Sequence, residues 1–548
     1  MRMPRRLALL LLAAVLHGCG ARTEVYSGNG TGVAPLPAPM PPPPPVPVMA
    51  APPPPPAAAG VPADSGFNTE EYKLIEENEF RDPALHPLST FGIDVDPASY
   101  ANVRRFLSEG RLPPRDAVRI EELVNYFDYD YPSPAGEHPF SVTTEVAPAP
   151  WNPVHRLVHV GLQGRRVALE NMPPANLVFL LDVSGSMNSP DKLPLVKSAL
   201  RMLVDGLREE DRVAIVVYAG AAGMVLPPTS GANRAAILDA MERLEAGGST
   251  AGGQGIRLAY SVAREGFRQG GNNRVILATD GDFNVGASSD AELIRLVEQE
   301  RADGIALSVL GFGTGNLKDA KMEQLADRGN GNYAYIDNLL EARKVLVSEM
   351  GGTLLTIAKD VKVQVEFNPA EVKAYRLIGY ENRLLAAEDF EDDTKDAGEL
   401  GAGHSVTALY EVVPVGAPTP VRGTGPLRYQ ETRPGGRTAA RGELLNVKLR
   451  YQPPEGGASR LIEQPVRARP AAAPPSADFR FAAAVAEWGL LLRDSRFRGD
   501  ATHEQVLDLA RGALGEDRHG YRREFVRLVE DSRRIAAAAS DRPQVGTR

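Results

Sequence analysis

Short apolar runs alternate with amphipathic stretches between about residues 175 and 350, and this alternation constrains the fold more than any other feature. The strand-like runs are Leu177–Leu181, Val213–Ala219, Val275–Ala278 and Ile305–Leu310. Continuous apolar runs of this length are typical of parallel strands that are covered on both faces. Between the first two runs, leucine and valine recur at helical spacing. The pattern predicts an α/β fold with a doubly wound, mostly parallel sheet.

On both sides of this region the apolar residues alternate with a period of two. Residues 139–162 show it, with Phe140, Val142 and Val146 on one parity, and so do several segments after residue 355. This alternation is typical of antiparallel strands in a sandwich. The first segment is too short to form its own sheet, so we expect it to pair with the later strands. The α/β domain is then an insertion in an antiparallel β-sandwich.

Helices are expected at both ends of the folded part. Asp96-Pro97 is typical of an N-cap followed by proline at the first helical position, which predicts a helix that ends near Gly110. A second helix is expected from Asp116 to about Phe127. After the RPAAAPPS linker at 469–476, three helices are expected over 477–497, 503–514 and 518–537, with Trp488 in their core.

The first 67 residues differ from the rest in composition. Three arginines precede the short apolar run Leu7–Leu16, which is typical of a secretory signal peptide. The sequence Leu16-His17-Gly18-Cys19 resembles the lipobox of bacterial lipoproteins. The resemblance implies cleavage before Cys19, lipidation of Cys19 and a place in the bacterial cell envelope, and Gly20 favours the outer membrane. An ordinary cleaved signal with a coincidental cysteine is the alternative.

Residues 34–63 are mostly proline and alanine and favour polyproline II. They predict either a stiff tether, roughly 90 Å long at full extension, or a disordered spacer with no length requirement. The expected order is a lipoprotein signal peptide (1–18), a disordered tether (19–67), an N-terminal flanking region (68–170), the α/β domain (171–352), the β-sandwich (353–468) and C-terminal helices (477–540).

Several function classes lack their signatures. The net charge is −9 and no stripe of Lys and Arg with interleaved aromatics occurs, which argues against nucleic-acid binding. There is no GxxxxGK[ST], and Gly311, Gly313 and Gly315 form GxGxG rather than the dinucleotide pattern, so no nucleotide is expected. There is also no HExxH motif for a catalytic zinc.

Oxygen-bearing side chains follow the predicted strands where those strands end. Asp182, Ser184 and Ser186 stand in LDVSGSM, Thr250 in a glycine-rich loop and Asp280 in ATDGD. Ligands of open α/β sheets bind beyond the carboxyl ends of the strands. Two carboxylates and three hydroxyls are hard ligands that suit Mg²⁺. The sequence therefore predicts a divalent-cation site.

This set resembles the metal-ion-dependent adhesion site (MIDAS) of von Willebrand factor A (VWA) domains. The resemblance implies that Ser184, Ser186 and Thr250 reach the cation directly, and that Asp182 and Asp280 act partly through water. An open coordination position would then accept an Asp or Glu of a partner protein. The segments LSTFGIDVDPASYANVRRFL, EELVNYFDYDYP and LIGYENRLL are similar to bacterial VWA lipoproteins of the YfbK type.

Three functions follow as hypotheses. The first is a membrane-tethered, non-enzymatic binding module that uses a divalent cation, Mg²⁺ before Mn²⁺ or Ca²⁺, to capture an acidic side chain. The second is an envelope scaffold in which the cation is structural. The third is a metal-assisted hydrolase, which needs a general base beside the metal-bound water, and the sequence offers none.

Overall fold

The computed structural model describes residues 70–248, 252–281, 290–314, 317–349, 355–395, 397–418, 442–467 and 474–540. All of them belong to the second of two compact units, Gly66–Arg548. Cys19 and the Pro/Ala-rich segment lie outside the described residues. No helix among the described residues is both long and apolar enough to cross a lipid bilayer.

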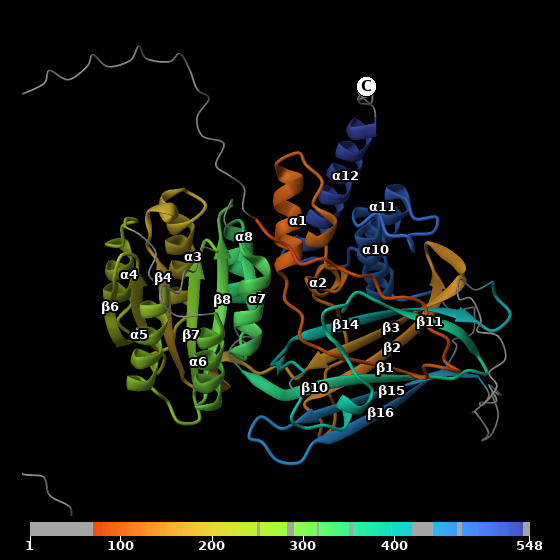
Figure 1. Cartoon of the computed structure of the whole chain (residues 1–548), viewed down its shortest axis with the longest axis horizontal. Coiled ribbons are helices and arrows are strands. Elements are labelled where there is room, and N and C mark those ends of the chain that lie inside the picture. The colour runs from red at the N-terminus through yellow and green to blue at the C-terminus, as the bar shows by residue number, and fades with distance from the viewer. Residues whose placement is uncertain are drawn as a thin grey trace, which may run out of the picture. The chain divides into compact units, whose positions relative to one another are not determined.

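The α/β domain is built on a six-stranded sheet with the order β6-β5-β4-β7-β8-β9 (Figure 1). Its strands are β4 (Ala175–Asp182), β5 (Arg212–Tyr218), β6 (Ala222–Ser230), β7 (Asn272–Thr279), β8 (Ile305–Phe312) and β9 (Tyr333–Ile336). All neighbours pair in parallel except β6, which runs antiparallel to β5 at the edge. The predicted mostly parallel sheet is confirmed. The edge strand β6 was not predicted, because Pro227 and Pro228 interrupt its pattern.

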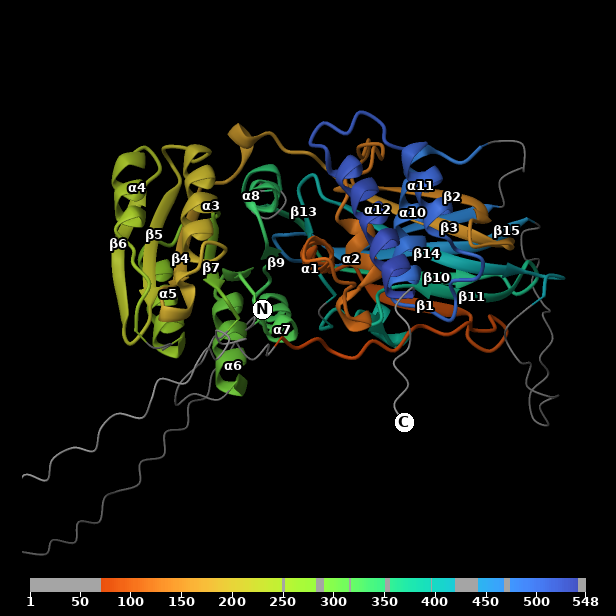
Figure 2. The ribbon, with the colours of Figure 1, turned by 90° about the horizontal axis from the view of Figure 1, so that it is seen from above.

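Helices cover both faces of this sheet (Figure 2). One face carries α3 (Leu193–Asp205), α4 (Arg234–Glu242) and α8 (Leu339–Arg343), and the other carries α5 (Gly252–Glu265), α6 (Asp290–Ala302) and α7 (Asp319–Arg328). Two separate apolar cores result, one on each face. Burial on both faces explains why the strands are continuous apolar runs.

Two antiparallel sheets form the sandwich. One has the order β12-β1-β10-β15-β16, and the other β11-β14-β3-β2. The strands are β1 (Leu88–Gly92), β2 (Phe140–Ala149), β3 (Asn152–Gly164), β10 (Thr356–Phe367), β11 (Val372–Ile378), β12 (Leu384–Leu385), β13 (Leu400–Gly401), β14 (Ser405–Pro414), β15 (Glu443–Gln452) and β16 (Arg460–Arg467). Strand β1 pairs with β10, and β3 with β14. The predicted insertion of the α/β domain into a sandwich is therefore confirmed (Figure 1).

A helical layer packs on the β14-β3 side of the sandwich. It comprises α1 (Ala98–Ser108), α2 (Ile120–Asn125), α10 (Ala477–Leu492), α11 (His503–Arg511) and α12 (Tyr521–Ser540). One apolar cluster joins these helices to Leu157 and Leu409 of the sheet. Trp488 is fully buried in this cluster and donates a hydrogen bond to Ser532 Oγ at 3.0 Å, as its predicted core position requires.

Two local expectations were wrong. Asp96 does not cap α1, because its Oδ1 accepts a hydrogen bond from the backbone N–H of Tyr333 in the α/β domain instead. The second predicted helix is a 3₁₀ turn, Arg115–Ala117, followed by the shorter α2. A tertiary partner thus replaced the local role that the sequence suggested for Asp96.

Candidate metal centre

Asp182 and Asp280 stand at the carboxyl ends of the two central strands of the α/β sheet. Asp182 is the last residue of β4, and Asp280 directly follows β7, which pairs in parallel with β4. The chain proceeds from β4 to β5 on one side, and then crosses to β7, β8 and β9 on the other. The two carboxylates therefore lie at the topological switch point, where loops diverge and ligands bind in open α/β sheets.

The carboxylate of Asp182 is buried and fixed by hydrogen bonds. Oδ1 accepts from the backbone N–H of Ser184 at 2.9 Å, and Oδ2 accepts from the hydroxyl of Tyr218 at 3.0 Å. Burial raises the pKa of Asp182 above its usual value, and the negative charge of Asp280 adds to that rise, while the hydrogen bonds from Ser184 and Tyr218 oppose it. Two buried acidic groups that repel each other favour a bound cation.

The serine hydroxyls and the glycine-rich loop meet beside Asp182. Ser184 Oγ and Ser186 Oγ are 3.0 Å apart. The backbone N–H of Gly247 donates to Val183 O at 2.7 Å, and that of Gly185 donates to Gly248 O at 3.0 Å. The loop that leads to Thr250 is therefore tied to the DxSxS segment, while Thr250 itself lies outside the described residues.

Lys192 is a charged neighbour that the sequence did not reveal. Its Nζ donates to Asp280 Oδ2 at 2.9 Å, and the lysine side chain is 9% exposed and that of Asp280 0%. Gly313, with φ +71°, leaves room for the lysine stem, since a Cβ there would approach Lys192 Cε and Cγ to 2.4 Å. The sequence signal that could have indicated this contact is the lysine of DKL, which stands directly before α3.

The donors present fit a small divalent cation. The described members of the set bring together two carboxylates and two hydroxyls, all hard oxygen ligands. Among the described residues no three His, Cys, Asp or Glu side chains cluster closely enough to hold a metal ion. A cation here would thus depend on hydroxyl and water ligands as well, and Lys192 already neutralises one oxygen of Asp280.

His155 and His159, four residues apart on β3, serve structural roles. His155 Nδ1 lies 2.6 Å from Glu411 Oε1, and His159 Nε2 lies 2.7 Å from the hydroxyl of Tyr131. Each ring is buried with its own partner, so the pair does not form a metal site.

Comparison with known families defines the class of this chain. The model of the von Willebrand factor type A domain matches residues 176–347, and a second model, described as von Willebrand factor, matches residues 66–159. The inserted α/β domain is therefore a VWA domain, a class of domain that serves mainly in protein–protein interaction.

The flanking regions define the family. The C-terminal model of the uncharacterized protein YfbK matches residues 352–535. YfbK of Escherichia coli K12 is 46% identical over 469 residues, which cover 84% of this chain and 81% of that protein. The chain belongs to the YfbK family of bacterial VWA proteins.

Other relatives match over less of the chain or at lower identity. The uncharacterized protein sll0103 of Synechocystis is 34% identical over 169 residues, which cover 31% of this chain and 39% of that protein. The solved von Willebrand factor type A protein of Catenulispora acidiphila covers 72% of this chain and 92% of its own, at 20% identity and a TM-score of 0.38. The ArnB paralog VWA2 of Sulfolobus acidocaldarius covers 72% and 98%, at 13% identity and a TM-score of 0.35.

Proposed function

We propose that this protein is a membrane-anchored, metal-dependent protein-binding module of the bacterial cell envelope. Its VWA domain holds a divalent cation, Mg²⁺ in the first place, with Asp182, Ser184, Ser186, Thr250 and Asp280. The cation captures an Asp or Glu side chain of a partner protein. No catalytic residues are assigned.

The convergence of oxygen ligands at the switch point carries this proposal. Asp182 and Asp280 are both buried at the ends of adjacent strands, and the hydroxyls of Ser184 and Ser186 lie side by side, with that of Ser184 bonded to Asp182. A buried carboxylate pair with one ammonium partner still has excess negative charge, which a divalent ion would neutralise. Hydroxyl ligands add no charge, so the ion keeps its affinity for an external carboxylate.

The membrane anchor rests on the sequence around Cys19. A signal-like apolar run ends at this sole cysteine of the chain. We propose that Cys19 carries lipid, with the outer membrane as the favoured location, and that the Pro/Ala-rich segment spans from there to the folded part. Several acyl chains on one residue give stable anchoring. Mass spectrometry of the N-terminal peptide tests it, with Cys19→Ala expected to release the protein from membranes.

Cation binding tests the central claim. Titration calorimetry of EDTA-treated protein with Mg²⁺ and Mn²⁺ is expected to show one site, with affinity at least tenfold lower in Asp182→Asn and Asp280→Asn. Asp205→Asn, on an exposed position of α3, is the matched control and is expected to bind as the wild type does. Equal affinity in all variants contradicts the assigned ligands.

Partner capture tests the function itself. Affinity capture from solubilised envelopes is expected to retain a protein with Mg²⁺ present, and to lose it with chelator and with Asp182→Asn. Capture that is insensitive to both changes contradicts a metal-dependent binding module. If the cation binds but no partner does, and chelation lowers the unfolding temperature, the cation is structural and the scaffold alternative holds.

A further inference from the structure

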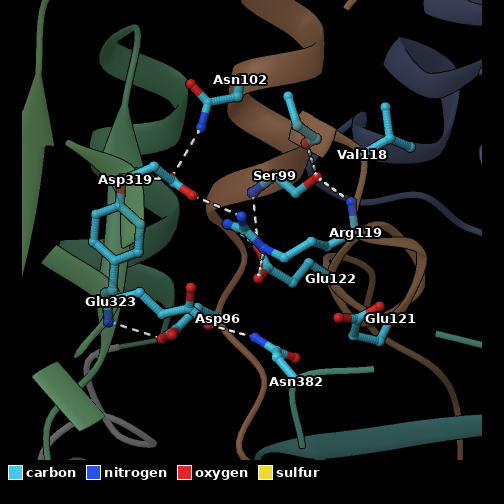
Figure 3. A network of polar contacts seen from close by, with 12 residues as sticks. Asp96, Ser99, Asn102, Val118, Arg119, Glu121, Glu122, Asp319, Glu323 and Asn382 are labelled. Carbon is cyan, nitrogen blue, oxygen red and sulfur yellow. Dashed lines mark hydrogen bonds and ion pairs between the residues drawn. The ribbon is translucent and has the colours of Figure 1, made fainter. Parts of the chain in front are cut away.

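The VWA domain contacts the rest of the chain through a buried polar seam. On one side of the seam lie Asp94, Asp96, Arg119, Glu122 and Arg383, from the flanking region and the sandwich. On the other side lie Asp319, Glu323 and Asp327, which are spaced four residues apart along α7. Figure 3 shows the part of this network around Arg119. Because charged groups meet across this interface, the docking of the VWA domain depends on their protonation and therefore on pH.

Arg119 joins α2 to the start of α7. Its Nη1 donates to Asp319 Oδ2 at 2.6 Å, and its other nitrogens donate to both carboxylate oxygens of Glu122. The backbone N–H of Ser99 also donates to Glu122, at 2.8 Å (Figure 3). Arg119, Glu122 and Asp319 are each less than a tenth exposed, so water screens their charges little.

Arg383 joins the sandwich to the other end of α7. It donates to Asp327 Oδ2 at 2.6 Å and to Glu323 Oε1 at 3.0 Å. Its guanidinium also lies 3.5 Å from Asp94 Oδ2 and 3.6 Å from Asp96 Oδ2. One guanidinium therefore faces four carboxyl groups, which it cannot neutralise if all of them are ionised.

The charges in the seam do not balance. Six carboxyl groups face two guanidinium groups. Other neighbours do not compensate, because the nearby Glu121 is also acidic and Arg493 pairs with Glu381. The same excess recurs further along, where Arg104 contacts Asp337, Glu341 and Glu524. Lys344 in that region pairs with Glu349.

Apolar contact across the seam is small. Of the flanking region, only Ala98 and Ala101 of α1 join the apolar core of the VWA domain among the described residues. By contrast, α1 and α2 share a large aromatic and aliphatic core with α10, α11 and α12. Cavities of about 400 Å³ and 250 Å³ also border the seam, and Asp94 lines both. Polar pairs, rather than packing, therefore decide whether the VWA domain stays docked.

We propose that protons shared among the seam carboxyl groups hold the VWA domain against the sandwich, and that deprotonation loosens the domain as pH rises. Neutral carboxyl groups can share hydrogen bonds with one another and leave the guanidinium groups balanced. Fully ionised, the same groups repel across the interface. This device is independent of the cation site and of any partner.

The direction of the effect follows from linkage. Burial raises the pKa of Glu122 to about 8, and burial with the charge of Asp94 raises the pKa of Asp327 to about 7. Burial also raises the pKa of Asp96 and Glu323. Undocked, these groups have ordinary pKa values of 3.8 for Asp and 4.5 for Glu. Each of these groups therefore holds its proton more tightly in the docked state, so the docking constant falls as pH rises, and for Asp327 and Glu122 this fall extends to about pH 7 and pH 8.

Intramolecular energy transfer between dyes on the two domains tests the proposal. Phe267→Cys in the VWA domain and Leu461→Cys on β16 place labels at exposed positions, in the full chain with Cys19→Ser. Transfer is expected to be highest near pH 5 and to fall as pH rises towards 8. Far-UV circular dichroism at each pH verifies that the domains remain folded.

Neutral variants separate this device from general effects of pH. Glu323→Gln with Asp327→Asn is expected to keep high transfer at pH 8, and Glu323→Gln alone to show an intermediate response if the double variant does not fold. Glu298→Gln, whose partner is Arg328 outside the seam, is the control and is expected to follow the wild type. Constant wild-type transfer between pH 5 and 9, or an unchanged response in the neutral variants, overturns the proposal.

Discussion

The ammonium group of Lys192 lies 2.9 Å from Asp280 Oδ2, at the carboxyl end of β7. This contact places a fixed positive charge beside the predicted cation. A cation at this site would share the carboxylate of Asp280 with this ammonium group. A divalent ion at this site must therefore tolerate a neighbouring ammonium group, which weakens its binding.

Lys192→Met tests this relationship. Without divalent cations the variant is expected to lose about 3 kcal/mol of unfolding free energy, because a buried carboxylate loses its partner. Its affinity for Mg²⁺ is expected to rise about tenfold, because the repulsion is gone. Thermal unfolding with EDTA and with Mg²⁺, together with calorimetric titration, measures both effects.

Lys197→Met, in the helix that begins directly after Lys192, is the control. In the described part of the chain, the hydrogen bond of Lys197 Nζ is one to the backbone O of Glu242 at the surface, so little change is expected. A Lys192→Met protein that binds Mg²⁺ more weakly than the wild type would contradict a repulsive role for Lys192.

Gly313→Ala is expected to displace Lys192 from Asp280. The φ of +71° disfavours alanine, and its Cβ would clash with the lysine stem. We expect a loss of about 1–3 kcal/mol, measured by denaturant unfolding. Gly223→Ala, where an added Cβ meets nothing within 4 Å and φ is not in the left-handed region, is the control. Equal stability of the two variants would refute the steric argument.

His159 is expected to make the sandwich sensitive to acid. Burial lowers the pKa of His159 to about 4 from 6.5. The neutral ring therefore contributes stability that is complete above pH 6.5 and is lost as pH falls through 4. Between pH 6.5 and 4.5 the loss is about 2 kcal/mol. Denaturant unfolding of wild type and His159→Gln at both values measures it, and parallel losses in both proteins would exclude His159 as the cause.

Trp488→Phe is expected to destabilise the helical layer by about 2 kcal/mol. It removes the hydrogen bond to Ser532 and leaves a small cavity in a fully buried cluster. Ser532→Ala separates the two effects, because it removes only the hydrogen bond and leaves the indole N–H without a partner. Chemical denaturation that shows no loss in either variant would contradict the predicted role of this core.

Periodicity predicted the architecture where each element had a simple environment. Strands β4, β7 and β8 are buried on both faces, and their continuous apolar runs show it. The pairing of the 139–162 region with later strands could be predicted because this region has too few neighbouring strands in sequence to form a sheet of its own. Strand β14 is also buried almost throughout, because helices cover its second face, and alternation alone did not predict that cover.

Long-range polar contacts could not be predicted from local patterns. Asp96 followed by proline is a good capping sequence, yet its carboxylate bonds the backbone of Tyr333, more than two hundred residues later. Nothing in the local sequence distinguishes Lys192 from other lysines, because its partner Asp280 follows β7, far along the chain. The spacing of Asp182, Ser184 and Ser186 was informative because all three lie within five residues at the end of β4. The partners of Arg119 and Arg383, by contrast, depend on how the domains dock.

Since β3 pairs with β14 and β1 with β10, the sandwich cannot close until the strands on both sides of the VWA segment are available. The inserted domain, whose strand neighbours lie close together along the chain, is free to reach its native state first. Until then, strands β1 to β3 have backbone N–H and C=O groups without their later partners. Pairing between strands so far apart in sequence slows folding. Chaperone demand during biogenesis should accordingly fall on residues 88–164 rather than on the interaction module.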